Sequence, residues 1–191
     1  MSDKKKLEST FLNMFIVLTV ISLVSAFAIG LAFYLTNDQA EKVKKEKFDN
    51  AVKSVVPDFD ELEERREVEI DGDKLALYRA KKGGAVVGTA VETVSHKGFG
   101  GDVLLLVGFD GNGNIHNSSI LSIKETPGLG SNMDTPKFKD QINGKNPDSF
   151  KLKVKKDGGD IDAITAATIS SRAFSDAVSK AVRAYKSASA Q

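Results

Sequence analysis

The sequence predicts an α+β protein, in which a single N-terminal transmembrane helix precedes one domain with an antiparallel sheet and flanking helices. An uncharged apolar run occupies residues 11–35. Strand-like segments follow, separated by short glycine-rich turns as in hairpins. The chain then ends in a segment with apolar residues at helical spacing. We therefore expect an N-terminal tail and anchor at 1–36, a juxtamembrane helix and connection at 37–66, and the domain at 67–191.

The apolar run is long enough to remain as a membrane anchor. About 20 apolar residues cross a bilayer core of ~30 Å, and the run from Phe11 to Leu35 meets that requirement with some tilt. The alternative is a cleaved signal peptide, whose apolar region spans only ~7–15 residues. Ala26-Phe27-Ala28 resembles a cleavage tripeptide, but it lies in the middle of the run. We expect a single retained span.

Basic residues on both sides of this run bear on its orientation. Lys4–Lys6 precede the span and favour a cytoplasmic N-terminus, whereas several lysines within residues 42–47 follow it. Taken alone, the lysines before the span weakly favour a domain on the side of the membrane opposite the cytoplasm.

The segments after the span alternate between helix and strand signals. Residues Asn37–Val56 predict a helix that Pro57 stops, and residues 58–66 predict a solvated connection. The expected strands are Leu75–Ala80, Ala85–Val94, Val103–Phe109 and Ile115–Ile123. A short helix at Lys137–Ile142 and a lysine-rich strand at Lys151–Lys155 are expected next. The final helix presents one apolar stripe: Phe174, Ala177, Val178, Ala181, Val182 and Tyr185.

Composition excludes several kinds of chemistry. Lys and Arg number 27 against 26 Asp and Glu, so the net charge of +1 gives no reason to expect nucleic-acid binding. The chain has no Cys and only two His, which excludes an iron–sulfur cluster on its own thiolates and a cysteine zinc site. We therefore predict no metal site, and any redox chemistry must come from an organic cofactor.

Two glycine-rich segments imitate ligand-binding loops. Asp110-Gly-Asn112-Gly-Asn114 begins like a calcium loop, but Ile115 and Leu121 stand where the loop needs Gly and Glu. A hairpin turn is the better interpretation. Gly98-Phe99-Gly100-Gly101 follows a strand but opens no helix, so a dinucleotide-binding fingerprint is not supported.

Two further segments have the composition of a binding site. In Glu125-Thr126-Pro127-Gly128-Leu129-Gly130, the glycines would let backbone N–H groups approach a ligand, although a simple Pro-Gly turn explains the segment equally well. Asp162 to Ser171 carries four hydroxyls and the adjacent alanines Ala166 and Ala167 directly before the last helix. These hydroxyls can act as helix caps, with Thr165 the expected N-cap. Alternatively, the free N–H groups at the helix start can bind a phosphate.

These two segments resemble the signatures of membrane-anchored FMN-binding domains. Asp162-Ala-Ile-Thr165-Ala166-Ala167-Thr168 is similar to that family's flavinylation motif, and Glu125 to Gly130 is similar to its second signature. The turn at residues 98–102 also resembles the family's glycine turn. The nearest members are the RnfG components of the Rnf electron-transport complex, and the NqrC components of the sodium-pumping NADH:quinone reductase share the motifs. Two departures are Ala166, where Gly is common, and Ile123, where His is expected.

The resemblance implies a site and a cofactor. In the family, a flavin transferase joins the last Thr of the motif to FMN through a phosphoester, which assigns the covalent bond to Thr168. The other residues that the resemblance places around the flavin are Thr165, Ala166, Ala167, Ser170, Glu125, Thr126, Gly128, Leu129 and Gly130.

The resemblance also implies a function. The Rnf complex is an ion-translocating oxidoreductase that couples electron transfer between ferredoxin and NAD to ion movement, and RnfG is an electron carrier within it. The implied setting is the cytoplasmic (inner) membrane, with the N-terminus in the cytoplasm, the domain in the periplasm or outside, and membrane lipid and the other Rnf subunits as partners. Three alternatives stay open: an NqrC-like component, a standalone extracytoplasmic flavoprotein, and an anchored binding domain without a cofactor.

Overall fold

The structure is a computed structural model that describes residues 10–189, so Lys4–Lys6 lie outside the described residues. The chain divides into two compact units, Met1–Glu46 and Lys47–Gln191. Each unit is considered by itself.

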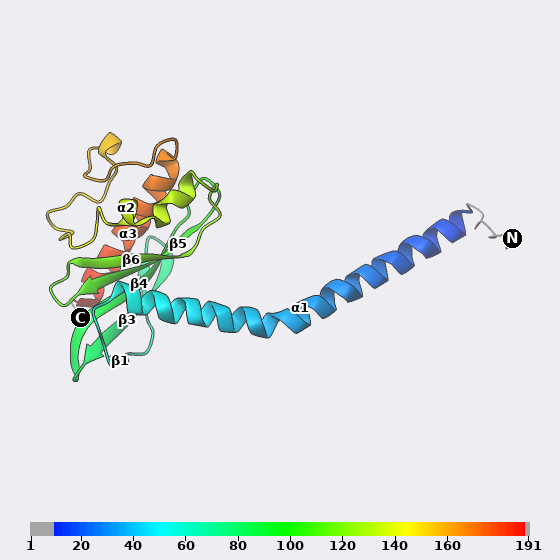
Figure 1. Ribbon diagram of the computed structural model, residues 1–191, viewed down its shortest axis with the longest axis horizontal. Helices are drawn as coiled ribbons and strands as arrows, with labels where there is room; N and C mark the ends of the chain where they lie inside the picture. The colour runs from blue at the N-terminus through cyan, green and yellow to red at the C-terminus, as the bar shows by residue number, and fades with distance from the viewer. Residues whose placement is uncertain (1–9, 190–191) are drawn as a thin grey trace. The chain divides into compact units, whose positions relative to one another are not determined.

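Helix α1 runs from Phe11 to Val55 (Figure 1). Among the described residues it is the one helix long and apolar enough to cross a membrane, and none of its most apolar stretch is buried inside the protein. Large side chains such as Phe15 and Leu23 are exposed on it, as a lipid-facing surface requires. The predicted helix at 37–56 is the continuation of this same helix, and it ends two residues before Pro57 because proline cannot continue the hydrogen-bond ladder.

Six antiparallel strands form one sheet. They are β1 (Glu61–Leu62), β2 (Arg66–Ile70), β3 (Asp73–Lys82), β4 (Ala85–Ser95), β5 (Val103–Asp110) and β6 (Ile115–Ser122). The order across the sheet is β1-β3-β4-β5-β6, and β2 also pairs with β3. The four predicted strands and the antiparallel α+β class are confirmed.

The segment predicted as a solvated connection is partly a sheet edge, so that prediction is wrong in part. Glu61 and Leu62 pair with Lys81 and Ala80 of β3. Leu62 packs against the small apolar cluster on that side of the sheet, and this contact holds the short β1 strand in place.

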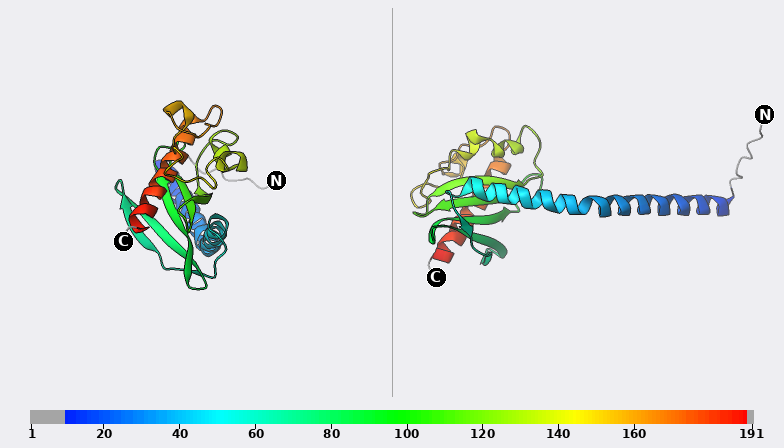
Figure 2. Two further views of the ribbon diagram at one scale, coloured as in Figure 1. Left: turned by 90° about the vertical axis from the view of Figure 1, so that its left-hand side faces the viewer. Right: turned by 60° about the horizontal axis from the view of Figure 1, so that its bottom comes forward.

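The sheet of the second unit is covered on both faces. Helix α3 (Thr168–Ser189) packs on one face, and its predicted apolar stripe contributes the buried Phe174, Ala177, Val178 and Ala181 to the main core. The last turns of α1 pack on the opposite face through Val52 and Val55 (Figure 2, left). Neighbouring residues of β5 alternate between these two layers, as the period of two in a strand requires.

A long connection joins β6 to α3. It contains the 3₁₀ helices η1 (Gly130–Asp134) and η2 (Lys155–Asp157) and the short helix α2 (Pro136–Lys139). The predicted short helix at Lys137–Ile142 is present as α2, which starts one residue earlier and already ends at Lys139. The predicted strand at 151–155 is wrong: Val154 makes an isolated bridge with Ile161, and no ladder follows. The alternation there arises because Leu152 and Val154 point inward from a loop while the lysines between them face water.

The predicted hairpin turn between β5 and β6 is confirmed. The backbone N–H groups of Asn112 and Asn114 both donate to Asp110 Oδ1 at 2.9 Å. Asp110 thus closes the turn with its own side chain, as aspartate commonly does.

Candidate functional site

Three segments that are far apart in the sequence surround one hollow of about 360 Å³ in the second unit. The glycine turn after β4 contributes Phe99, and the segment after β6 contributes Glu125, Thr126, Leu129 and Gly130. The start of α3 contributes Ala166, Ala167, Thr168, Ile169 and Ser170. The two signatures and the turn singled out in the sequence therefore meet at one place.

Glu125 holds the three segments together. Its side chain is buried, with the residue only 9 % exposed. Carboxylate Oε1 accepts a hydrogen bond from the backbone N–H of Phe99 at 2.8 Å, and Oε2 accepts one from the Ser170 hydroxyl at 2.9 Å. A buried carboxylate needs such partners, and here they come from the glycine turn and from α3. One side chain thereby fixes the walls of the hollow relative to one another.

The segment 126–131 is both a turn and a wall of the hollow. The Leu129 N–H donates to the Thr126 carbonyl at 3.1 Å, and Gly128 has a φ of 76°, the left-handed region that favours glycine. At Gly130, a Cβ atom would lie 2.5 Å from both Glu125 Oε2 and Ser170 Oγ. Gly130 is therefore required for the Glu125–Ser170 contact to form.

The start of α3 differs from the prediction at Thr165. The helix begins at Thr168, and the Ser171 N–H donates to the Ala167 carbonyl, so Ala167 occupies the capping position and Thr165 does not. The Ile164 N–H donates to the Ser171 hydroxyl at 2.9 Å. The Ser171 side chain, inside the helix, thus accepts a hydrogen bond from the preceding loop. The expected contact, from the Thr165 side chain to an N–H group of the helix, is replaced by this one.

Ala166 adopts a backbone conformation that is uncommon for alanine. The Ala167 N–H donates to the Ile164 carbonyl at 3.0 Å, which closes a turn over Thr165 and Ala166. Ala166 is the third residue of this turn and has a φ of 60°. Glycine is favoured there because the left-handed region crowds a Cβ atom. The methyl group of Ala166 therefore strains the backbone directly before the helix.

The hydroxyls between Asp162 and Ser171, in and just after the segment that resembles the flavinylation motif, have different surroundings. Ser170 donates to Glu125, and the buried Ser171 donates to the Ala167 carbonyl at 3.0 Å. Thr168 lines the hollow, and Lys156 Nζ donates to its Oγ1 at 3.4 Å. The N–H groups of the first helical turn, which have no carbonyl within the helix, start at this same residue.

Lys156 reaches Thr168 because an ion pair holds its loop against α3. Arg172 Nε and Nη2 donate to the two carboxylate oxygens of Asp157 at 2.7 and 2.8 Å. The Arg172 guanidinium holds the pKa of Asp157 below its usual range. The pair is bidentate, which fixes orientation as well as distance. No sequence pattern pointed to Lys156, because its approach depends on how the long connection folds.

Thr165 and Gly128 line a second hollow of about 650 Å³. Its other lining residues are Asn132, Thr135, Lys137, Phe138, Gln141, Asp162, Ala163 and Ile164. Thr165 and Ala166 are consecutive in the chain yet line different hollows, as do Gly128 and Leu129. The predicted site residues therefore divide between two cavities, with Thr168 in the smaller one.

The smaller hollow has an apolar rim. Four large hydrophobic side chains of residues 47–189 are exposed: Val86, Phe99, Leu129 and Ile169. The last three, exposed by 71 %, 41 % and 48 %, all line this hollow. Exposed apolar groups gathered around a concavity are typical of a ligand site. Phe99 and Ile169 were not among the predicted site residues, although each lies in a segment that the sequence singled out, the glycine turn and the stretch from Asp162 to Ser171.

Comparison with known proteins identifies the same region. Residues 98–183 match the family described as FMN-binding domain. The G subunit of the ion-translocating oxidoreductase complex of Methanosarcina acetivorans is 34 % identical over 187 residues, covering 95 % of this chain and 96 % of that protein. The Vibrio cholerae protein of the same name is 31 % identical over 182 residues, which are 87 % of this chain and 86 % of its own.

A clostridial relative has a more specific name. The G subunit of the proton-translocating ferredoxin:NAD(+) oxidoreductase complex of Clostridium ljungdahlii is 32 % identical over 166 residues, covering 86 % of each chain. These similarities extend over most of both partners, and the matched FMN-binding region includes all three segments around the hollow. The chain therefore belongs to the family of G subunits of ion-translocating oxidoreductase complexes.

Proposed function

We propose that this protein is the membrane-anchored electron-transfer subunit of an Rnf-type complex, which couples electron transfer between ferredoxin and NAD to ion translocation, and that Thr168 carries its FMN covalently. The observation that best supports this proposal is the environment of Thr168. Thr168 lines a hollow rimmed by exposed apolar side chains, and the Lys156 ammonium lies beside its hydroxyl. The isolated chain is an electron carrier, and the whole complex is the oxidoreductase.

The residues around the hollow suit the two ends of FMN. A phosphate on Thr168 would be near Lys156 Nζ and near the N-terminus of α3, where positive charge and free N–H groups stabilise an anion. The rim residues Phe99, Leu129 and Ile169 offer apolar contact to an aromatic ring system. When bound, FMN supplies the capacity to accept and donate electrons, and the protein supplies position and electrostatics.

Covalent attachment requires a hydroxyl that is not already committed. Ser170 and Ser171 donate their protons to acceptors inside the protein, and Thr165 lines the other hollow. Thr168 is the remaining hydroxyl of the segment. Its oxygen would lose the proton and bond to the flavin phosphate of a dinucleotide donor, while the phosphoanhydride bond of that donor breaks and the other nucleotide leaves. A flavin transferase would make this bond, and the other subunits of the complex and membrane lipid would be the lasting partners.

The proposed topology places the N-terminus in the cytoplasm and the domain in the periplasm or outside. Helix α1 offers one candidate span near the N-terminus, and Lys4–Lys6 precede it. A reporter fused after Gln191 that is active only in the cytoplasm would contradict this orientation.

The attachment is tested with a matched pair of threonine variants, Thr168→Val and Thr165→Val. Valine keeps the shape of threonine but lacks the oxygen. Each chain is expressed with its flavin transferase, extracted from membranes and analysed by intact mass and by in-gel flavin fluorescence after denaturing electrophoresis. We expect Thr168→Val to lose both the added mass and the fluorescent band, and Thr165→Val to keep them. Covalent flavin on Thr168→Val would refute the assignment.

A further inference from the structure

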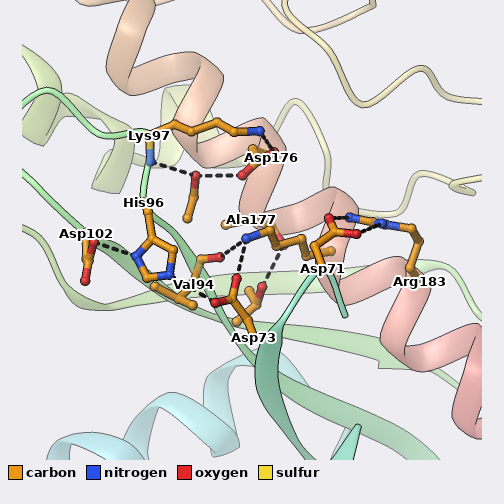
Figure 3. Close-up of polar contacts among 12 residues, drawn as sticks. Asp71, Asp73, Val94, His96, Lys97, Asp102, Asp176, Ala177 and Arg183 are labelled. Atoms are coloured by element: carbon orange, nitrogen blue, oxygen red, sulfur yellow. Dashed lines mark hydrogen bonds and ion pairs between the residues drawn. The ribbon is translucent and has the colours of Figure 1, made fainter. Parts of the chain in front are cut away.

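A cluster of charged side chains surrounds His96, directly before the glycine turn (Figure 3). His96 Nδ1 lies 2.7 Å from Asp102 Oδ1, and Nε2 lies 3.1 Å from Asp73 Oδ1. A neutral imidazole carries one N–H and can donate to only one of these carboxylates. Both contacts are satisfied together when the ring is doubly protonated and the two carboxylates are ionised. The geometry therefore matches a charged His96.

The two carboxylates are not held equally. Asp73 also accepts a hydrogen bond from Lys180 Nζ at 2.6 Å, and Lys180 donates to the Val94 carbonyl at 3.1 Å. The Lys180 side chain is only 7 % exposed, so α3 fixes Asp73 from inside the domain. The Asp102 side chain is 64 % exposed and sits at the other end of the glycine turn. Of the two acceptors, Asp102 is the one whose side chain is oriented by its contact with His96.

The other charged groups around the cluster already have partners. Lys97 Nζ donates to Asp176 Oδ1 at 2.6 Å, and the Ser95 hydroxyl donates to Asp176 Oδ2 at 2.8 Å. Arg183 pairs with Asp71 through both carboxylate oxygens. These groups come from the β2–β3 turn, the end of β4 and α3. Histidine is the side chain of this cluster whose ordinary pKa, about 6.5, lies near neutral pH.

The turn that His96 restrains forms part of the candidate flavin site. Phe99, in the middle of the turn, lines the hollow and donates its N–H to Glu125 Oε1 at 2.8 Å. The turn closes the β4–β5 hairpin after its last pair, Ser95 and Val103. Beyond that ladder it has two side-chain attachments, one inside the hollow through Glu125 and one on the outer surface through Asp102. Without the second, Glu125 would be the remaining side-chain attachment of the turn.

We propose that His96 is a positioning residue of the flavin site: in its doubly protonated form it holds the turn at residues 98–101 through Asp102, and so keeps Phe99 over the flavin. The proposal rests on the proposed function for the identity of the ligand. It assigns a role to a side chain that does not touch the hollow.

The direction of the titration follows from the two carboxylates. Hydrogen bonds with Asp102 and then Asp73 raise the pKa of His96 above its ordinary value. A group with a raised folded-state pKa stabilises fully below its unfolded value of about 6.5, and its contribution is lost as the pH rises through the folded-state pKa. We therefore expect the turn to be held below the ordinary histidine pKa of about 6.5 and released as the pH rises through the raised pKa of His96.

The first test follows the turn itself, in the full chain in detergent and without flavin. Amide hydrogen exchange of peptides covering residues 96–103 is measured by mass spectrometry across the titration and corrected for intrinsic exchange. Protection should fall in one step with a midpoint above about pH 6.5 in the native chain. It should be low and independent of pH in His96→Gln and in Asp102→Asn. His116→Gln removes the other histidine, which lies on β6, and should keep the native step.

The second test follows the flavin in the loaded chain. Quenching of flavin fluorescence by the uncharged quencher acrylamide should rise through the same midpoint in the native chain and be high throughout in His96→Gln. Protection that does not change with pH would overturn the restraint on the turn. A turn that titrates while flavin quenching stays constant would overturn its link to the flavin. A chain that carries no flavin would instead overturn the proposed function, and with it the role of His96 at a flavin site.

Discussion

The left-handed conformation of Ala166 allows a stabilising substitution to be predicted in the candidate site. At a φ of 60°, an L-residue other than glycine is disfavoured by roughly 1–2 kcal/mol. Ala166→Gly removes this strain. Glycine also increases the entropy of the unfolded chain, which costs about 0.4–1 kcal/mol. The net expectation is a gain of about 0.5–1 kcal/mol in the free energy of unfolding, or about 1–4 °C in Tm for a domain of this size.

The measurement is urea or thermal unfolding of the flavin-free protein, followed by circular dichroism. Ala163→Gly is the matched control: it makes the same chemical change three residues earlier, at a residue without a positive φ. The control should lose about 0.4–1 kcal/mol, because it gains unfolded-state entropy with no strain to relieve. If Ala166→Gly destabilises the protein as much as Ala163→Gly does, Ala166 is not strained.

Three further predictions concern the hollow and the cluster beside it. Lys156→Met should slow covalent flavin attachment by up to about fivefold, which corresponds to the loss of about 1 kcal/mol from an interaction of an exposed charge. The control Lys153→Met should leave the rate unchanged. Equal rates in the two variants would mean that Lys156 does not contribute to attachment. Gly130→Ala places a methyl against the Glu125 carboxylate and should cost about 1–3 kcal/mol in urea unfolding; an unaltered midpoint would mean that the contact is absent. Hydrogen bonds from Lys180 and His96 lower the pKa of Asp73, so its contribution is present above the unfolded value of about 3.9 and is lost on acidification. Lys180→Met should therefore make the loss of stability below that pH shallower, and an equal slope would contradict the pairing.

Strong periodic patterns made most of the fold predictable. The uncharged run, the strands β3 to β6 and the stripe on α3 each bury or expose a continuous apolar face, which the sequence displays directly. Strand β2 was missed because its Arg-Glu-Val-Glu-Ile sequence is mostly charged and exposed. The strand predicted at 151–155 was wrong because alternating apolar and polar residues show only which side chains face inward. A loop that lies over a core can show the same alternation without pairing with a strand.

The candidate site was predictable as a set of segments but not as a set of contacts. The motif resemblance assigned Glu125 and Thr168 to the same site, and in the structure both line one hollow. The Glu125–Ser170 hydrogen bond, the approach of Lys156 and the strain at Ala166 depend on how three distant segments meet. Local sequence propensity carries no information on contacts between distant segments. It also assigned the N-cap to Thr165, whereas in the structure the Ser171 hydroxyl accepts a hydrogen bond from the Ile164 N–H of the preceding loop.

The unequal burial of the hydroxyls at the start of α3 bears on the order of maturation. In an unfolded chain, Thr165, Thr168, Ser170 and Ser171 would be equally open to a modifying enzyme. In the folded domain, both serine hydroxyls are buried and hydrogen-bonded, and Thr165 lines the other hollow. Thr168 remains, with its hydroxyl beside Lys156. Selective attachment to one hydroxyl then follows when the enzyme meets an already folded domain. In the proposed topology, the protein would cross the membrane and fold first, and the flavin would be added afterwards by a transferase on that same side.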